Sequence, residues 1–305
     1  MIPLALVTGF LGSGKTTLLQ RVVEKNRRRR IVYLVNEFSP RDVDGARLRA
    51  ETDAVCLIPG GSIFCRCLVT EFIDALQSLP ERFGTAAAPV AGVVIEASGM
   101  ADPGVIRTLL QETQLDRKYR LASIVAVVDP KSFLKLIHTL PAILAQIGAA
   151  DRVLVNKIDL ASPEELAATE NAILEAAPRA RILCACRCAV NLDLFGRAPQ
   201  RHLRGRLAAC VDPHYARLAL RFSGNADVDD LRRRIAALAD DVYRAKGFVP
   251  AGGRLLSFDY SAAGFEVTEN SGTAAEPELA FVVRGPARRR VAKALFAVAH
   301  ASLDD

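Results

Sequence analysis

The sequence predicts a doubly wound α/β domain with a mostly parallel sheet, followed by a smaller α+β domain. Short apolar runs recur without polar alternation through the first ~190 residues, as expected of strands that are buried on both faces of a parallel sheet. Helical stretches separate most of these runs, which favours a doubly wound arrangement. Beyond a basic stretch that contains glycine and proline, the pattern changes to half-exposed strands and helices.

The expected strands of the first domain are Leu4–Val7, Ile31–Val35, Val93–Ile95, Ile124–Val128, Val153–Val155 and Arg181–Leu183. In the second domain, Arg217–Phe222 alternates like a half-exposed strand. A helix is then predicted from one apolar stripe, with Gly247 as its C-cap. The stripe consists of Val228, Leu231, Ile235, Leu238 and Val242. Three strands follow over 254–260, 264–269 and 279–285, and a last helix covers about 287–301. The predicted domains are 1–196 and 216–305, joined by a linker over 197–215.

The composition is that of a soluble globular protein, with 50% hydrophobic and 24% charged residues. No apolar run reaches the ~18–20 residues of a membrane span, and the N-terminus lacks the features of a signal peptide, so we expect a cytoplasmic protein without membrane contact. The net charge of +6 comes mostly from arginine runs at 27–30, 232–234 and 288–290. We interpret them as solvated helix faces and ends. No aromatic residues are interleaved to stack on bases, which disfavours a nucleic-acid partner.

Residues 9–16, GFLGSGKT, fit the pattern G-x-x-x-x-G-K-[ST] between an expected strand and an expected helix. Inward-turned backbone N–H groups and the N-terminus of the helix bind phosphates in such loops. Lys15 is expected to contact the β- and γ-phosphates and to act in catalysis, and the Thr16 hydroxyl to hold Mg²⁺. The residues assigned to nucleotide binding here are Gly9, Gly12, Ser13, Gly14, Lys15, Thr16 and Thr17.

The motif Asn156-Lys157-Ile158-Asp159 follows the apolar run RVLV, so it lies at the ligand-binding edge of the predicted sheet. The Asp159 carboxylate can accept from guanine N1–H and the 2-amino group, whereas adenine offers neither donor. This asymmetry favours GTP over ATP. We expect Lys157 to lie along the base plane and Asn156 to hold the loop.

Glu96 ends another apolar strand, and Gly99 follows it three residues later. A carboxylate in this place can bind Mg²⁺ through water or orient the attacking water, and the Gly99 amide can meet the γ-phosphate. The alternative is that this segment only begins the next helix. Together with the other two motifs, it predicts a GTPase that converts GTP to GDP and phosphate.

Several segments in order carry a family resemblance: GFLGSGKTTLL, LVNEF, the cysteine stretch FCRC, IEASGMADP and NKIDL, then YRAKGF and FVVRG past the linker. In these segments the chain resembles the CobW-like P-loop GTPases, relatives of the nickel-accessory GTPases of urease and hydrogenase maturation. The resemblance implies a GTPase domain, a smaller CobW-like C-terminal domain, and a metallochaperone or metal-insertion role toward a client metalloprotein. GTP is then expected to bias two switch segments, Glu37–Asp44 and Glu96–Asp102.

The family's metal motif C-x-C-C reads Cys65-Arg66-Cys67-Leu68 here, so the last thiolate is missing. In an extended chain, residues i and i+2 point the same way, so Cys65 and Cys67 can offer two sulfurs to one Zn²⁺ or Co²⁺. Glu37 matches the family's acidic residue near the metal and is the candidate third ligand.

A second cysteine group, Cys184, Cys186 and Cys188, would share one face if it continued a strand. We interpret it as packing, with metal binding as the alternative. Two other functions stay open for the chain: a regulatory GTPase that binds protein partners without carrying metal, and a nucleic-acid-associated NTPase that rests on the arginine runs alone. The sequence does not name the client and leaves a homo-oligomer open.

Overall fold

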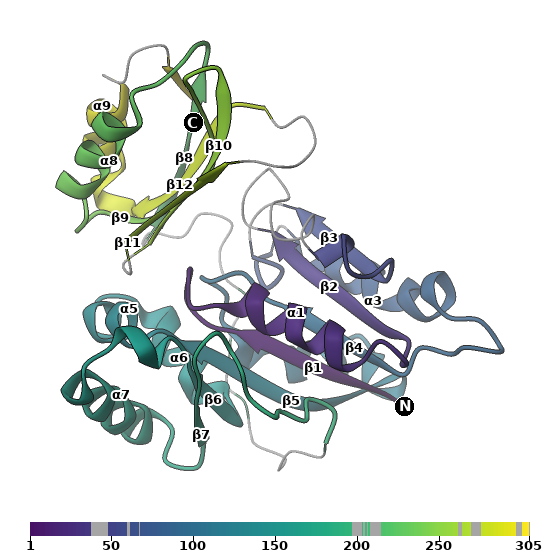
Figure 1. The fold of residues 1–305 in the computed structure, drawn as a ribbon. Coiled ribbons are helices and arrows are strands. Elements are labelled where there is room, and N and C mark those ends of the chain that lie inside the picture. Colours follow the sequence, from purple (N-terminus) through teal and green to yellow (C-terminus); the bar gives the residue numbers. More distant parts are fainter. Residues whose placement is uncertain are drawn as a thin grey trace. The chain divides into compact units, whose positions relative to one another are not determined.

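The computed structural model divides the chain into two compact units, Met1–Cys210 and Val211–Asp305 (Figure 1). It describes residues 1–37, 48–59, 62–66, 68–196, 203, 205, 207, 215–261, 264–269, 276–296 and 301–304. The predicted linker over 197–215 and most of the switch segment Glu37–Asp44 therefore lie largely outside the described residues. Within the described part of the chain, no helix combines the length and apolar character that a membrane crossing needs.

The first unit contains a seven-stranded sheet in the order β3-β2-β4-β1-β5-β6-β7. All neighbouring strands run parallel, which confirms the predicted fold class. The strands are β1 (Ile2–Thr8), β2 (Ile31–Glu37), β3 (Val55–Pro59), β4 (Gly92–Glu96), β5 (Tyr119–Val128), β6 (Arg152–Val155) and β7 (Arg181–Cys184). The α-helices described in this unit are α1 (Lys15–Lys25), α3 (Val69–Phe83), α4 (Ile106–Glu112), α5 (Pro130–Leu136), α6 (Pro141–Ala149) and α7 (Pro163–Ala176).

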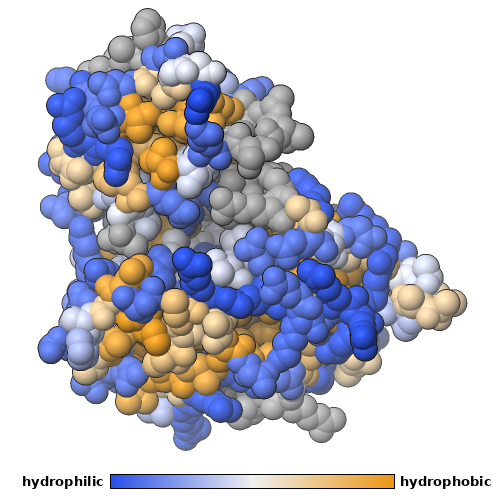
Figure 2. Space-filling model, in the orientation of Figure 1, coloured by the Kyte–Doolittle hydropathy of each residue, from blue (hydrophilic) through white to orange (hydrophobic). Residues whose placement is uncertain are grey.

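The central strand β1 is buried on both of its faces, which explains its continuous apolar sequence. Ala5 and Val7 pack in one core cluster with Leu18 and Leu19 of α1. The residues between them, Leu4 and Leu6, point to the opposite face and are also fully buried. Outside the buried face of α1 the surface in view is hydrophilic, while more apolar residues gather over α5 and α6 (Figure 2).

The second unit is a six-stranded antiparallel sheet in the order β11-β10-β9-β12-β8-β13. Its elements are β8 (Tyr215–Phe222), α8 (Val228–Ala237), β9 (Val242–Ala251), β10 (Arg254–Ser261), β11 (Gly264–Glu269), β12 (Glu278–Arg284), α9 (Arg288–Phe296) and β13 (Ala301–Asp304). One core cluster joins α8 and α9 to the sheet through Leu231, Ile235, Val291 and Leu295. A small α+β unit was therefore predicted correctly.

Two details of the C-terminal prediction are wrong. The helix predicted to run on to Gly247 ends at Ala237, and Val242 begins β9. Gly247 lies inside that strand with φ 156°, where a Cβ would stand 2.1 Å from the Glu278 carbonyl oxygen of β12. This glycine therefore permits close strand approach, not a helix end. The last helix is described as far as Phe296, and Ala301, predicted to belong to that helix, instead begins an edge strand beside β8.

Candidate functional site: a phosphate cradle at the carboxyl edge of the sheet

The loop between β1 and α1 has the shape of a phosphate cradle. Gly9, Gly12 and Gly14 all have positive φ values, of 133°, 78° and 111°. A Cβ on Gly9 would stand 2.2 Å from the Val127 carbonyl oxygen. Glycine is therefore required for the backbone to take this path. Gly14 is also the N-cap residue of α1, so the free N–H groups of the first helical turn adjoin the loop and fit a polyphosphate.

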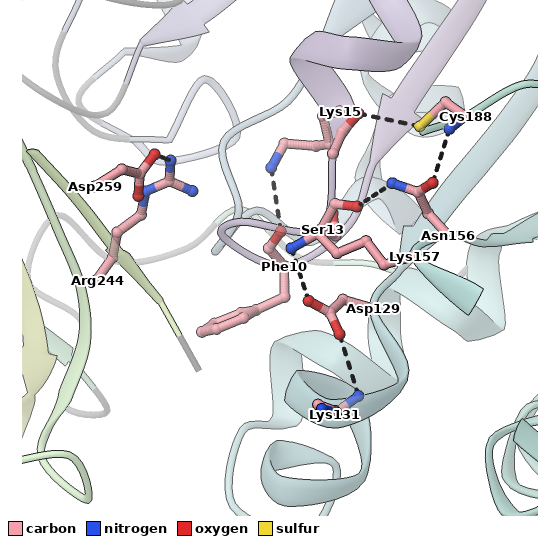
Figure 3. A network of polar contacts seen from close by, with 11 residues as sticks. Phe10, Ser13, Lys15, Asp129, Lys131, Asn156, Lys157, Cys188, Arg244 and Asp259 are labelled. Atoms are coloured by element: carbon pink, nitrogen blue, oxygen red, sulfur yellow. Dashed lines mark hydrogen bonds and ion pairs between the residues drawn. The ribbon is translucent and has the colours of Figure 1, made fainter. Parts of the chain in front are cut away.

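Lys15 is held over this loop by backbone oxygens. Its Nζ donates to the carbonyl of Gly9 at 2.9 Å and to that of Phe10 at 3.4 Å (Figure 3). The side chain is buried, with 8% of its surface exposed. The ammonium group therefore lies beside the cradle, as the sequence motif predicts.

The Thr16 hydroxyl and the Glu96 carboxylate lie next to each other at the carboxyl edge of the sheet. Glu96 ends β4, where it is paired with Val7 of β1, and the Thr16 Oγ1 is 3.4 Å from its Oε1. Glu96 is 5% exposed. Hydroxyl and carboxylate oxygens are the ligands that Mg²⁺ takes in phosphate-transferring sites, directly or through water. The donor set fits a magnesium ion at the cradle.

Gly99 lies against the phosphate loop. A Cβ at this position would come within 2.7 Å of the Leu11 backbone nitrogen. The Gln146 side chain, which is buried, holds this segment by donating to the carbonyls of Gly99 at 3.0 Å and Ala101 at 3.2 Å. Gln146 was not identified from the sequence, because nothing in the apolar helix around it indicates a link to residues more than forty positions earlier.

Asn156 joins the cradle to a loop that follows β7. Its Nδ2 donates to the Ser13 carbonyl at 3.0 Å, and its Oδ1 accepts from the Cys188 backbone N–H at 2.8 Å (Figure 3). The Cys188 thiol donates to the Gly14 carbonyl at 3.4 Å. Burial raises the pKa of this thiol to about 12, so the sulfur keeps its proton. These contacts close a ring that fixes the two loops relative to each other.

Lys157 adopts a left-handed conformation, with φ 59°, and its Nζ contacts the buried Asp129 carboxylate at 2.9 Å. Asp129 also accepts from the Lys131 N–H as the N-cap of α5. Asp129 was missed from the sequence, although an aspartate before a proline at the end of a strand is a signal for a helix cap. It gives the Lys157 side chain a fixed direction.

Asp159 is exposed in the short turn after Lys157. A hydrogen bond from the Cys186 thiol, then one from its own backbone N–H, lowers the pKa of its carboxyl group. The carboxylate is thus ionised and exposed. The three cysteines of this region do not share a strand face, because β7 ends at Cys184: Cys184 is exposed, Cys186 half-buried and Cys188 buried.

The predicted metal residues are only partly described. Cys65 is buried, and its sulfur is in a disulfide, so the thiolate that binds a metal requires the reduced protein. Cys67 and the side chain of Glu37 lie outside the described residues. Among the residues that the structure does describe, no group of three histidine, cysteine, aspartate or glutamate side chains is arranged to hold a metal ion.

Comparison with known proteins gives a family and several relatives. Residues 3–184 match the sequence model of a family described as "CobW/HypB/UreG, nucleotide-binding domain". The chain is 33% identical over 165 residues to a protein of Escherichia coli strain K12 named zinc chaperone YjiA, covering 54% of this chain and 52% of that protein. It is 30% identical over 193 residues to zinc-regulated GTPase metalloprotein activator 1 of Schizosaccharomyces pombe, covering 60% of this chain and 45% of that protein.

A solved structure of Zn(II)-bound YjiA GTPase from Escherichia coli aligns with 96% of this chain and 97% of its own, at 21% identity and a TM-score of 0.47. The chain spans about half the length of the curated relatives that it matches.

Proposed function

Because the chain belongs to the CobW/HypB/UreG family, we propose that it is a GTP-binding and GTP-hydrolysing metallochaperone or metal-insertion factor. The client is a metalloprotein, and the cargo is Zn²⁺ or Co²⁺. Residues 1–196 form the GTPase domain, 197–215 the linker and 216–305 a CobW-like C-terminal domain. The chain acts in the cytoplasm. The names of two relatives, a zinc chaperone and a zinc-regulated GTPase, support the choice of metal.

The observation that carries the nucleotide half of this proposal is the ring through Asn156. It connects the phosphate loop at Ser13 to the loop at Cys188, and Asn156 directly precedes Lys157 and Asp159 on the chain. One nucleotide therefore meets both loops, with its phosphates at the cradle and its base at Asp159. The ionised Asp159 carboxylate accepts from the guanine edge, and Lys157, steered by Asp129, lies along the base.

Hydrolysis uses the groups around the cradle. Thr16 directly, and Glu96 through water, would hold Mg²⁺, which would supply positive charge to the phosphates. Lys15 leaves its carbonyl contacts and donates to the β- and γ-phosphates. Glu96 orients the attacking water, and the Gly99 N–H meets the γ-phosphate. The other proposed nucleotide contacts are backbone N–H groups of the loop and the first turn of α1: Gly9, Gly12, Ser13, Gly14 and Thr17.

The metal half of the proposal rests on Cys65, Cys67 and Glu37. Two thiolates and a carboxylate leave one place of a zinc tetrahedron for water or a client ligand. An open site suits delivery, because a transferred metal must be able to leave. Leu68 stands where the family has a third cysteine. We therefore expect that Leu68→Cys tightens metal binding, measured by competition with a chelating dye.

Turnover tests the enzymatic part of the proposal. The wild-type protein should hydrolyse GTP in preference to ATP, with phosphate release as the readout. Lys15→Ala should abolish turnover, and Glu96→Ala should lower kcat more than it weakens GTP binding. A Glu96→Ala variant that hydrolyses GTP at the wild-type rate would refute the role assigned to this carboxylate.

A regulatory GTPase without metal is the second candidate, and the absent third thiol at Leu68 favours it. Zinc stoichiometry of the reduced protein, measured with GTP and with GDP, separates the two functions. One zinc per chain in either state supports the metallochaperone. GTP binding without stoichiometric zinc in both states supports the regulatory GTPase instead.

A further inference from the structure

Asn36 lies near the end of β2 and connects three segments of the first unit through its side chain. Its Oδ1 accepts from the backbone N–H of Ile63 at 3.0 Å and from that of Ser98 at 3.3 Å. Its Nδ2 donates to the Ile58 carbonyl of β3 at 3.3 Å. The side chain is buried, with 5% of the residue exposed. A carboxamide oxygen has two acceptor lone pairs, one for each of the two N–H groups.

The two N–H groups belong to the two functional loops of this edge of the sheet. Ser98 lies between Glu96 and Gly99, in the segment that meets the phosphate loop. Ile63 is two residues before Cys65. We propose that Asn36 is a positioning residue that couples these loops, so that the γ-phosphate contact of Gly99 sets the position of Cys65. This inference rests on the proposed GTP-dependent function.

The segment around Cys65 is built to transmit a displacement. Ile63 and Phe64 are fully buried, and the Phe64 ring packs edge-on against Phe72 of α3 at 5.6 Å between centroids. The Cys65 carbonyl accepts from the Val69 N–H at 3.0 Å, at the first turn of α3. Because close-packed groups move together, a shift of Ile63 moves Cys65 and the start of α3 with it.

The segment around Gly99, next to the phosphate loop, is also tightly packed. Gly99 already approaches the Leu11 nitrogen of the phosphate loop closely, and Gln146 fixes the carbonyl of Gly99. A phosphate that attracts the Gly99 N–H therefore turns the peptide group that this N–H shares with the Ser98 carbonyl, and through the Ser98 Cα it displaces the Ser98 N–H. The shared oxygen of Asn36 then favours a different position of Ile63.

Amide hydrogen exchange tests this coupling in the full chain, kept reduced, with GDP and with a non-hydrolysable GTP analogue. In the wild type, exchange at residues 62–66 and at residues 96–99 should change together. Asn36→Leu removes the acceptor and keeps the branching at Cγ, with a larger side chain. We expect it to reduce the nucleotide-dependent change at 62–66 by about fivefold, the factor of one ordinary hydrogen bond, while 96–99 still responds.

Two further variants complete the test. Asn36→Asp loses the donor to Ile58 but keeps the oxygen that accepts from Ile63 and Ser98, and should retain the coupling. Asn191→Leu, at an exposed asparagine that contacts Lys25 at the surface, should behave as the wild type. An undiminished response of 62–66 in Asn36→Leu, or an Asp variant that behaves as the Leu variant, overturns the inference. If Asn36→Leu does not fold, the wild type decides: a change at the Ser98 amide without one at Ile63 overturns it. Failure of the wild type to bind GTP contradicts the proposed function instead.

Discussion

The substitution Asn156→Ala removes both hydrogen bonds by which one side chain joins the phosphate loop to the loop after β7. Asn156 is 2% exposed, and its partners are 3.0 Å and 2.8 Å away. Two hydrogen bonds are worth about 2 kcal/mol net, and a buried N–H of Cys188 left without its partner costs about 1 kcal/mol more. We therefore expect a loss of about 3 kcal/mol in the free energy of unfolding of the first unit.

For a unit of about 200 residues, that loss lowers Tm by about 6–12 °C. Differential scanning calorimetry of the full chain measures it, and titration with GDP should show at least tenfold weaker binding because the two loops are no longer held in register. Asn191→Ala is the matched control, since it makes the same change at an exposed asparagine of the loop after β7, whose side chain accepts only at the surface, from Lys25, and it should cost under about 0.5 kcal/mol. Equal losses in the two variants would refute the role of the buried ring.

Three other predictions concern the same site. Gly9→Ala forces a Cβ to within 2.2 Å of the Val127 carbonyl oxygen and should abolish GTP binding in a titration, whereas Gly148→Ala, in open space on α6, should leave GTP affinity unchanged and stabilise the fold by up to ~1 kcal/mol. Asp159→Asn should weaken GTP strongly and favour xanthosine triphosphate; unchanged GTP affinity contradicts base recognition by this carboxylate. The Cys188 thiol keeps its proton in the folded chain up to a pKa of about 12 but loses it near pH 9 when unfolded, so its stabilising effect is full below pH 9 and is lost as the pH rises to about 12. Stability in urea should fall less steeply over that range in Cys188→Ser than in the wild type.

The parallel sheet was predictable because its strands carry their signal locally. Strands such as β1 and β4 are buried on both faces and are therefore uninterrupted apolar runs. The edge strand β3 was missed because its sequence, VCLIP, ends in proline, a residue that disfavours a strand assignment. The resemblance to the CobW-like family is confirmed by the match over residues 3–184.

In the second unit, local periodicity gave wrong helix ends, because strand pairing with distant residues determines the structure there. Val242 continues the helical spacing of Leu238, yet its backbone pairs with Val283 of β12. The strand β13 exists only by pairing with β8, some eighty residues earlier in the chain. Neither β12 nor β8 lies close enough in the sequence for a local pattern to predict these pairings.

In the candidate site, too, the residues of local motifs were predictable and the residues that position them were not. The motif residues lie at the ends of strands, where their sequence context predicts them. The residues that position them, Asn36, Asp129, Gln146 and Cys188, became visible only when β2, β4, β5 and the loop after β7 came together at one edge. Cys188 was interpreted from the sequence as a packing residue, but its contact with the phosphate loop 174 positions earlier was not predicted.

The proposed function and the coupling through Asn36 both require that bound GTP changes the affinity of Cys65 and Cys67 for a metal ion. Titration of the reduced protein with Co²⁺, in the presence of GDP or of a non-hydrolysable GTP analogue, tests it most directly by absorbance in the near ultraviolet. We predict one Co²⁺ per chain with sulfur-to-metal charge-transfer bands, an affinity that differs between the two nucleotides, and loss of the bands in the Cys65→Ser, Cys67→Ser double variant. Absence of the bands in the wild type, their persistence in the double variant, or an affinity indifferent to the nucleotide would contradict the claim.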